Sequence, residues 1–356
     1  MVDVELLEDT AAFGRLEPVW NTVVESASSS RCHSTYEWLF TWWKHFGGTN
    51  RLLLLVALEH GAPVALAPLY VAHDTGVLHF LGQGLSDYAD LIVPCGRQDI
   101  ADRLVTAILS RRDAWSGLDL EEIPEDSPNV QTLSRLGDEQ AGAVWQNTVR
   151  CPYLPIAVTW EAFYETLGKG FRHEVRNKLN RWEAMHRGEA TDSALEYLDV
   201  REVDSELFDE MVALSAERQR VDGHRSPLLN HPDQEFVREV LPLMGARGQL
   251  RVGELRGEGK LLAFMLAFYW QGVVSTWNTQ YKPSYASYSP GRLMLVRFAE
   301  QRFGEGCREL DLMRGEEPYK FEWTSHFRTN LALRSGLAAA GTTPCATGGD
   351  PTTGAC

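Results

Sequence analysis

The sequence has 356 residues, of which 44% are hydrophobic and 23% charged, as expected for a globular protein of two domains. Its net charge of −15 argues against general nucleic-acid binding through many phosphate contacts, although it allows a local basic patch. The six cysteines lie far apart without a Cys-x-x-Cys pair, which argues against a zinc site or a disulfide scaffold. Because the acidic start has no basic n-region and no apolar run approaches about 18 residues, we expect a cytoplasmic protein without a membrane span. Nothing in the composition indicates an oligomeric state.

Hydrophobic periodicity predicts alternating helices and strands in the first part of the chain. The helices are expected at 7–25, 36–47, 100–111 and 130–137, and the strands at 51–58, 63–71, 77–81, 89–93, 117–121 and 143–149. Residues 151–155 contain two prolines and show neither helical nor strand periodicity, so they are interpreted as a linker. The sequence therefore predicts a first domain over residues 1–150.

The second part of the chain opens with a strongly basic predicted helix at 169–187. Its lysines and arginines lie largely off an apolar stripe, so they form either a solvated face or a contact for phosphate. Further helices are expected at 159–167, 205–218, 232–245 and 290–303, and strands at 250–255, 261–269, 273–279 and 309–312. We expect a second domain over 151–335 and, because 336–356 contain few large apolar residues, a disordered tail there.

Two parts of the sequence have the same pattern of three short strands joined by glycine-containing turns. Gly61 and Gly76 punctuate the first meander, and Gly259 and Gly272 punctuate the second, about 200 residues later. A helix and a strand follow each meander. This similarity predicts a duplicated α/β (α+β) domain, with mixed sheets flanked by helices.

The second copy alone contains a distinctive helix start, Ser289-Pro290-Gly291-Arg292. Serine is a common N-cap and proline is favoured in the first helical turn, so in the plainer interpretation the segment simply begins a helix. The first turn of a helix also offers unpaired N–H groups and partial positive charge. Gly291 would let an anion approach the backbone, and Arg292 would add a full charge.

Familiar motifs of hydrolases, nucleotide hydrolases and metal enzymes are missing from the sequence. The ten histidines include no His-x-x-x-His pair, and neither a Gly-x-Ser-x-Gly elbow nor a Walker loop occurs.

Several segments together carry a family resemblance. They are Tyr36-Glu37-Trp38 with Trp42-Trp43, Phe80-Leu81-Gly82 with Asp87-Tyr88, Arg176-Asn177-Lys178-Leu179, Tyr288-Ser289-Pro290-Gly291-Arg292, and the run from Asp311 to Trp323. With these segments, spread over roughly residues 5–335, the chain resembles the acetyltransferase-like family of bacterial cellulose and exopolysaccharide loci (the CelD type). That family is similar to the FemAB-like branch of the GNAT superfamily.

The resemblance implies two tandem GNAT-like domains and metal-free transfer of an acyl group from acyl-CoA, such as acetyl-CoA, to an amine of a small molecule or saccharide precursor. The position that holds the acyl-CoA pyrophosphate in GNAT proteins corresponds here to Tyr288, Ser289, Gly291 and Arg292. This loop has fewer glycines and basic residues than usual. Two alternatives therefore stay open: a FemAB-like transferase that uses aminoacyl-tRNA, and a non-catalytic GNAT-like accessory protein.

Direct attack by an amine requires no nucleophilic residue, so the candidate residues have positioning or proton-transfer roles. Asp311 or Asp87 would accept the amine proton and Tyr319 would protonate the leaving thiolate, while a plainer interpretation gives both aspartates only local hydrogen bonds. Lys320 resembles a lysine of the FemAB-like relatives and, like Arg176, would contact a phosphate or an oxyanion. The residues expected to bind the acceptor are Arg176, Asp87, Tyr88 and Trp277.

Overall fold

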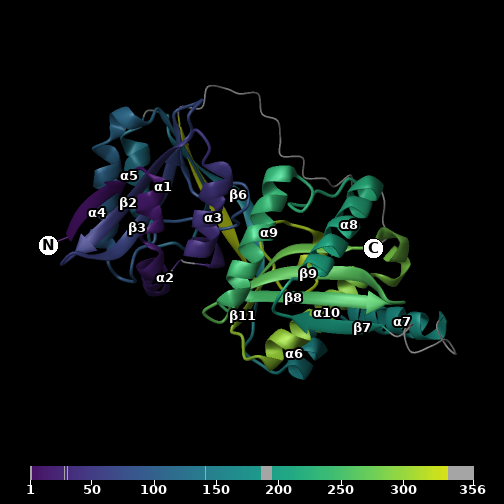
Figure 1. The fold of residues 1–356 in the computed structure, drawn as a ribbon. Coiled ribbons are helices and arrows are strands. Elements are labelled where there is room, and N and C mark those ends of the chain that lie inside the picture. The colour runs from purple at the N-terminus through teal and green to yellow at the C-terminus, as the bar shows by residue number, and fades with distance from the viewer. Residues whose placement is uncertain (1, 28, 30, 141, 186–194, 336–356) are drawn as a thin grey trace. The chain divides into compact units, whose positions relative to one another are not determined.

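The computed structural model describes residues 2–27, 29, 31–140, 142–185 and 195–335, which form two compact units (Figure 1). The first unit contains the described residues up to Cys151 together with β12 (Phe327–Ser335), and the second runs from Pro152 to His326. The second domain was expected to continue to residue 335, but the structure assigns 327–335 to the first unit because β12 pairs there with β5 (Gly117–Pro124). The tail expected at 336–356 lies outside the described residues.

The first unit is a mixed sheet with the strand order β1-β2-β3-β4-β5-β12. Its other strands are β1 (Val2–Leu7), β2 (Arg51–Glu59), β3 (Ala62–Val71) and β4 (Val77–Phe80), and its helices are α1 (Thr10–Gly14), α2 (Glu17–Ser26), α3 (Tyr36–Phe46), α4 (Gln98–Leu109) and α5 (Val130–Asp138), with 3-10 turns at Cys32–Ser34 and Arg112–Ala114. Neighbouring strands from β1 to β4 are antiparallel, whereas α4 connects β4 to a parallel β5. The core lies between these strands and α4, whose Ile100, Leu104 and Ile108 are fully buried.

The second unit repeats this topology with the strand order β6-β11-β10-β9-β8-β7. Its strands are the end of β6 (Val144–Pro155), β7 (Glu196–Val200), β8 (Leu250–Gly257), β9 (Lys260–Trp270), β10 (Val273–Tyr281) and β11 (Glu309–Asp311). Its helices are α6 (Trp160–Thr166), α7 (Lys169–Met185), α8 (Ser205–Asp222), α9 (His231–Ala246), α10 (Pro290–Gly304) and α11 (Pro318–Phe321), with a 3-10 turn, η4, at Pro283–Tyr288. Strands β7 to β10 are antiparallel neighbours, and α10 connects β10 to a parallel β11.

Helices cover both faces of the sheet in the second unit. Helices α8 and α9 lie on one side and α10 lies on the other (Figure 1). On the α10 side, Met294 and Phe298 pack with Met265 and Ala267 of β9 in one apolar core. Each face of the sheet therefore packs against its own layer of helices. The start of α10 follows the end of β10 after the η4 turn.

Three sequence expectations need correction. Residues 151–155 are not an irregular linker but the end of β6. Pro155 lies opposite Glu309 of β11, and the carbonyl of Pro152 accepts a hydrogen bond from the Leu312 N–H. The strand expected at 89–93 is reduced to an isolated bridge between Leu66 and Ile92. The helix expected at 7–25 is two helices, because the chain breaks after Gly14 and restarts with Pro18 in the first turn of α2.

No helix within the described ranges is long and apolar enough to cross a membrane.

Candidate functional site

The start of α10 is the centre of the candidate site. The helix begins at Pro290, as expected, and the carbonyl of Ser289 accepts its first hydrogen bond from the Leu293 N–H. Ser289 has the left-handed conformation (φ 51°) and, contrary to expectation, its side chain does not cap the helix. Its Oγ is buried, and neither this atom nor the N–H groups of Gly291 and Arg292 have a hydrogen-bond partner among the described residues. Three donors without protein acceptors are thus concentrated at one helix end, as an anion requires.

Gly291 leaves space beside these donors. A Cβ atom built on Gly291 would lie 3.5 Å from the Tyr281 ring, an ordinary van der Waals contact. The protein itself therefore does not require glycine here for steric reasons. A small residue at this position is instead consistent with close approach of a ligand to the backbone.

Strands β10 and β11 separate next to this helix start. They pair in parallel only from Val273 to Ser275, and β10 then continues to Tyr281 with β9 as its one strand partner among the described residues. At the same point Trp277 is an extra residue in β10, since Thr276 and Asn278 pair with consecutive residues of β9. This β-bulge bends β10 and leaves peptide groups along one edge for a ligand with its own amide groups.

Helix α7 brings positive charge to the same place. Lys178 donates from Nζ to the Ser287 carbonyl over 2.9 Å, and the Arg181 guanidinium carbon lies 5.4 Å from the centre of the Tyr288 ring. Tyr288 is itself buried and packs edge-on against Trp182 at 5.2 Å. The sequence identified α7 as basic, but it did not indicate Lys178 or Arg181 as neighbours of this loop because that proximity depends on tertiary packing.

Arg292 has a different environment from the one expected. Its guanidinium pairs with Glu174 at 2.6 Å and Glu322 at 2.9 Å, and it lies over the Phe171 ring. Two carboxylates therefore balance its charge. The backbone N–H of Arg292 remains available to a ligand. Its side chain links α10 to Glu174 of α7.

The candidate residues after β11 form a second group. Asp311 is fully buried, and its Oδ1 accepts a hydrogen bond from the Met313 N–H over 2.8 Å. Lys320 is 4% exposed and donates from Nζ to the carbonyls of Met313 and Arg314, and it also pairs with Glu317 at 2.9 Å. Its amino group therefore holds the loop that follows β11.

Tyr319 lies beside this loop with 41% of its surface exposed. The pKa of its hydroxyl is raised, chiefly by desolvation of the phenol oxygen and secondarily by the negative charge of Glu317. Tyr319 is therefore protonated at neutral pH and is a weaker acid than an ordinary tyrosine.

The remaining candidates are spread over both units. Trp277 is half-buried and packs against Phe268 at 5.8 Å, and Arg176 is exposed on α7. The charge of Arg176 acts at Tyr164, whose pKa nevertheless rises because burial outweighs the nearby arginines. Asp87 and Tyr88 belong to the first unit, whereas α10 belongs to the second.

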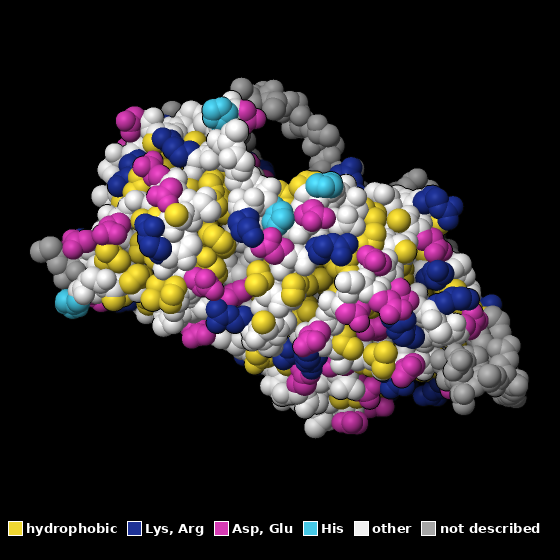
Figure 2. Space-filling view, viewed as in Figure 1, with side chains coloured by type: hydrophobic (Ala, Val, Ile, Leu, Met, Phe, Trp, Pro, Cys, Tyr) yellow, Lys and Arg dark blue, Asp and Glu magenta, His cyan; other side chains and the backbone are white. Residues whose placement is uncertain are grey.

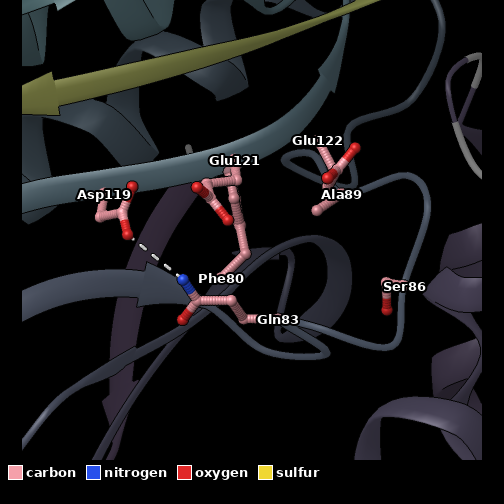
Figure 3. Close-up of a pocket in the computed structure, with 7 residues that line it drawn as sticks. All are labelled: Phe80, Gln83, Ser86, Ala89, Asp119, Glu121 and Glu122. Carbon is pink, nitrogen blue, oxygen red and sulfur yellow. Dashed lines mark hydrogen bonds between the residues drawn. The ribbon is translucent and has the colours of Figure 1, made fainter. Parts of the chain in front are cut away.

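Figure 3 shows a small cavity in the first unit, next to the loop that contains Asp87 and Tyr88. Gln83 donates a hydrogen bond to Asp119 across it, and Glu121 and Glu122 line it as well. Its volume of about 10 Å³ is enough for one water molecule but not for an acyl acceptor. Asp87 is buried and its carbonyl accepts a hydrogen bond from Asn330 Nδ2, so this loop packs against β12.

Comparison with known proteins adds independent information about the second unit. Residues 169–321 match the family model for the acetyltransferase (GNAT) domain, a range that runs from α7 through α10 to α11. None of the curated proteins matches the chain. This part of the chain is therefore similar to an acetyltransferase (GNAT) domain.

Solved structures show the fold of the whole chain. The crystal structure of FemX has a TM-score of 0.63 at 9% identity, over 93% of this chain and 96% of that one. The C-terminal domain of a putative lysylphosphatidylglycerol synthetase from Agrobacterium fabrum has a TM-score of 0.55 at 13% identity, over 91% and 92%. A tandem GNAT protein from the clavulanic acid biosynthesis pathway has a TM-score of 0.52 at 12% identity, over 95% and 100%. With the repeated topology, these likenesses confirm the expected tandem GNAT-like fold.

Proposed function

We propose that the second unit transfers an acyl group from acyl-CoA to an amine. The main support is the group of unpaired donors at the start of α10: the Ser289 hydroxyl and the N–H groups of Gly291 and Arg292. The match of residues 169–321 to an acetyltransferase (GNAT) domain agrees with this activity.

The residues present fit the chemical groups of acyl-CoA. A diphosphate accepts hydrogen bonds and carries negative charge, so it suits the α10 donors with Lys178 and Arg181 beside them. The amide-containing arm of acyl-CoA suits the free edge of β10 beyond Ser275. The donor would therefore be held by Ser289, Gly291, Arg292 and Lys178. The buried Tyr288 would support this loop by packing against Trp182.

When bound, acyl-CoA supplies a thioester whose carbonyl carbon an amine can attack. In the proposed reaction Asp311 accepts the proton of the attacking amine, directly or through water, as the new C–N bond forms. Tyr319 donates its proton to the sulfur as the C–S bond breaks. Lys320 positions the loop between these two residues, since it holds the carbonyls of Met313 and Arg314.

Aminoacyl-tRNA is the second candidate donor. The likeness of the fold to FemX and the basic residues of α7 favour it. The net charge of −15 and the mixture of acidic and basic side chains on the face shown in Figure 2 count against a long contact with tRNA. A role in cellulose or exopolysaccharide assembly has no support from the comparisons and stays a prediction of the sequence resemblance.

Binding of acetyl-CoA to the full chain, measured by calorimetry, tests the proposal. We expect saturable binding that weakens at least tenfold, or about 1.4 kcal/mol, in Gly291→Val and in Lys178→Ala. Gly304→Val in the last turn of the same helix and Lys260→Ala are matched controls, because no heavy atom lies within 4 Å of a Cβ built on Gly304 and Lys260 is an exposed lysine paired with Glu258. Release of free thiol in the presence of added amines then measures transfer.

The outcomes separate the three candidates. Acetyl-CoA binding that depends on Gly291 supports acyl-CoA as donor, whereas stabilisation by aminoacyl-tRNA alone supports the second candidate. Binding of neither donor would favour the non-catalytic accessory role.

A further inference from the structure

One face of β10 contains two buried amide side chains that the proposed reaction does not use. Asn278 and Gln280 pair in register with Leu266 and Phe264 of β9, so both point to the same face of the sheet, the one opposite α10. Asn278 is 9% exposed and Gln280 is 0% exposed. Asn278 Oδ1 and Gln280 Nε2 have no hydrogen-bond partner within the part of the chain that the structure describes.

Arg218 of α8 fixes the orientation of the Gln280 amide. Its Nη1 donates to Gln280 Oε1 over 3.2 Å and to the Thr279 carbonyl over 3.3 Å. A guanidinium is a donor only, so the amide cannot turn around without facing the guanidinium with its own N–H groups. Arg218 is also held by Asp222 at 3.4 Å and stacks on Tyr281 at 4.1 Å. The NH₂ group of Gln280 is therefore directed away from Arg218 with no acceptor of its own.

This pair differs from the usual contents of a protein core. Buried polar atoms in folded proteins nearly always have a partner, and an unpaired one calls for an explanation such as a bound molecule. Here an acceptor and a donor lie two residues apart on one strand face. They are on the stretch of β10 that has already lost β11 as a neighbour. The charge of Arg218 also acts at Tyr319, the proposed proton donor, which connects this face with the proposed reaction.

We infer that Asn278 and Gln280 select the acceptor, and that the acceptor is an amine with an oxygen atom on the adjacent carbon. Asn278 Oδ1 accepts a hydrogen bond from the amine, and Gln280 Nε2 donates one to the neighbouring hydroxyl or carbonyl oxygen. Vicinal amino alcohols, which include amino sugars, and amino-acid amides share this chemistry. The inference rests on the proposed acyl transfer and specifies its acceptor.

Two matched pairs of amines test the inference by binding to the full chain, independently of catalysis. An aminocyclohexanol with its two groups on adjacent carbons is compared with cyclohexylamine, and glycinamide is compared with propylamine. We expect at least one oxygen-containing amine to bind at least tenfold more tightly than its partner. The first pair reports a hydroxyl as the neighbouring oxygen and the second reports a carbonyl.

Variants connect this preference to the two side chains. Gln280→Glu keeps an oxygen for Arg218 but removes the N–H donors, and Asn278→Leu removes the unpaired acceptor; in each, the preference should fall below threefold. Gln249→Met is the matched control, because Gln249 is also a buried glutamine with an unpaired Oε1 in the second unit and should keep the preference. Thermal unfolding of each variant verifies that it is folded.

Equal binding of the paired amines to the native chain would overturn the inference, as would a preference that survives both Gln280→Glu and Asn278→Leu. Failure of the donor assignment looks different. In that case acetyl-CoA does not bind, yet the preference among amines still depends on Asn278 and Gln280.

Discussion

Lys320 shows how a residue singled out by sequence can have a structural task. Its amino group is buried, and all of its recorded partners, the carbonyls of Met313 and Arg314 and the carboxylate of Glu317, belong to one loop. A buried charge is tolerated only when such partners surround it. Met313 in this loop has a positive φ of 62°, a backbone conformation that needs support from its surroundings.

Lys320→Met should therefore destabilise the protein by about 1–3 kcal/mol, because two carbonyls and a carboxylate lose a charged donor. Urea unfolding of the variant and the native chain measures this difference. Lys260→Met is the control, since Lys260 is exposed and should change stability by less than about 0.5 kcal/mol. An unchanged midpoint for Lys320→Met, with lost transfer activity, would instead support direct contact of Lys320 with a ligand.

His79 gives the first unit a response to acid. It is 9% exposed, and its Nδ1 lies 3.1 Å from the carbonyl oxygen of Asp119. Burial lowers the pKa of His79 below its ordinary value, and the negative charge of Asp119 opposes this shift only in part. The unfolded chain therefore binds a proton more readily than the folded one as the pH falls below about 6.5.

The expected result is that stability contributed by neutral His79 is present above about pH 6.5 and is lost on acidification through the lowered pKa. His79→Gln, which keeps a donor for Asp119, should lose less stability than the native chain between about pH 7.5 and 5. Urea midpoints at the two pH values give the comparison. Equal acid sensitivity of both proteins would show that His79 does not titrate in this way.

Sequence reasoning located the start of α10 because the Ser-Pro signal is local, within four residues. It did not reveal that Ser289 leaves its hydroxyl unpaired, nor that Arg292 is paired with Glu174 across 118 positions of sequence. Such partners depend on which helices pack together. The unpaired atoms Asn278 Oδ1 and Gln280 Nε2 have no sequence signal either, because polar residues in a strand ordinarily indicate a solvated face.

At the scale of elements, the contact between α7 and α10 frames the proposed donor site. Arg292 joins the two helices through Glu174, and Lys178 and Arg181 of α7 approach the turn before α10. A basic helix whose positive side chains approach a helix start can both stabilise the fold and attract an anion. In this contact the Arg292 side chain stabilises the fold, whereas Lys178 and Arg181 attract the anion.

Arg292→Ala should separate these roles. We expect a loss of about 1–3 kcal/mol in the free energy of unfolding, since Glu174 and Glu322 lose their partner and Phe171 loses its stacked guanidinium. Acetyl-CoA affinity should change less than threefold, because the backbone N–H remains. Arg297→Ala, from an exposed pair with Glu300 on the same helix, serves as the control. A large loss of affinity without a loss of stability would assign the anion contact to the Arg292 side chain.

Elements with strong hydrophobic periodicity were predictable from the sequence, and three strands with weak periodicity were not. The meanders β2-β3-β4 and β8-β9-β10 follow the expected ranges closely because alternating and buried apolar runs mark them. Strands β1, β7 and β12 were missed, since short or partly exposed strands show little periodicity. Their identity depends on pairing with neighbours that are distant in sequence.

At the scale of the whole chain, the two units complete the same topology in different ways. In each, four antiparallel neighbours are followed by a helix and a parallel fifth strand, β5 or β11. A sixth, antiparallel strand then pairs with the fifth. For β11 it is the end of β6, which precedes the rest of its unit, and for β5 it is β12, which follows more than 200 residues later. The sequence repeats predicted the duplication. They did not predict that β12, near the end of the chain, pairs with β5 of the first unit.

A chain that ends at His326 tests the dependence of the first unit on β12. Residues Asn330 to Ser335 pair with β5, Leu333 is buried in the core, and Asn330 donates to the Asp87 carbonyl over 2.7 Å. Loss of this strand removes a core wall and exposes the β5 edge, a change comparable with the whole stability of a domain, about 5–15 kcal/mol. Limited proteolysis should therefore cleave within residues 2–151 much faster than in the full chain, while the second unit keeps its acetyl-CoA binding. A chain that ends at Ser335 should stay protected, because it retains β12; equal protection of both shortened chains would show that the first unit folds without this strand.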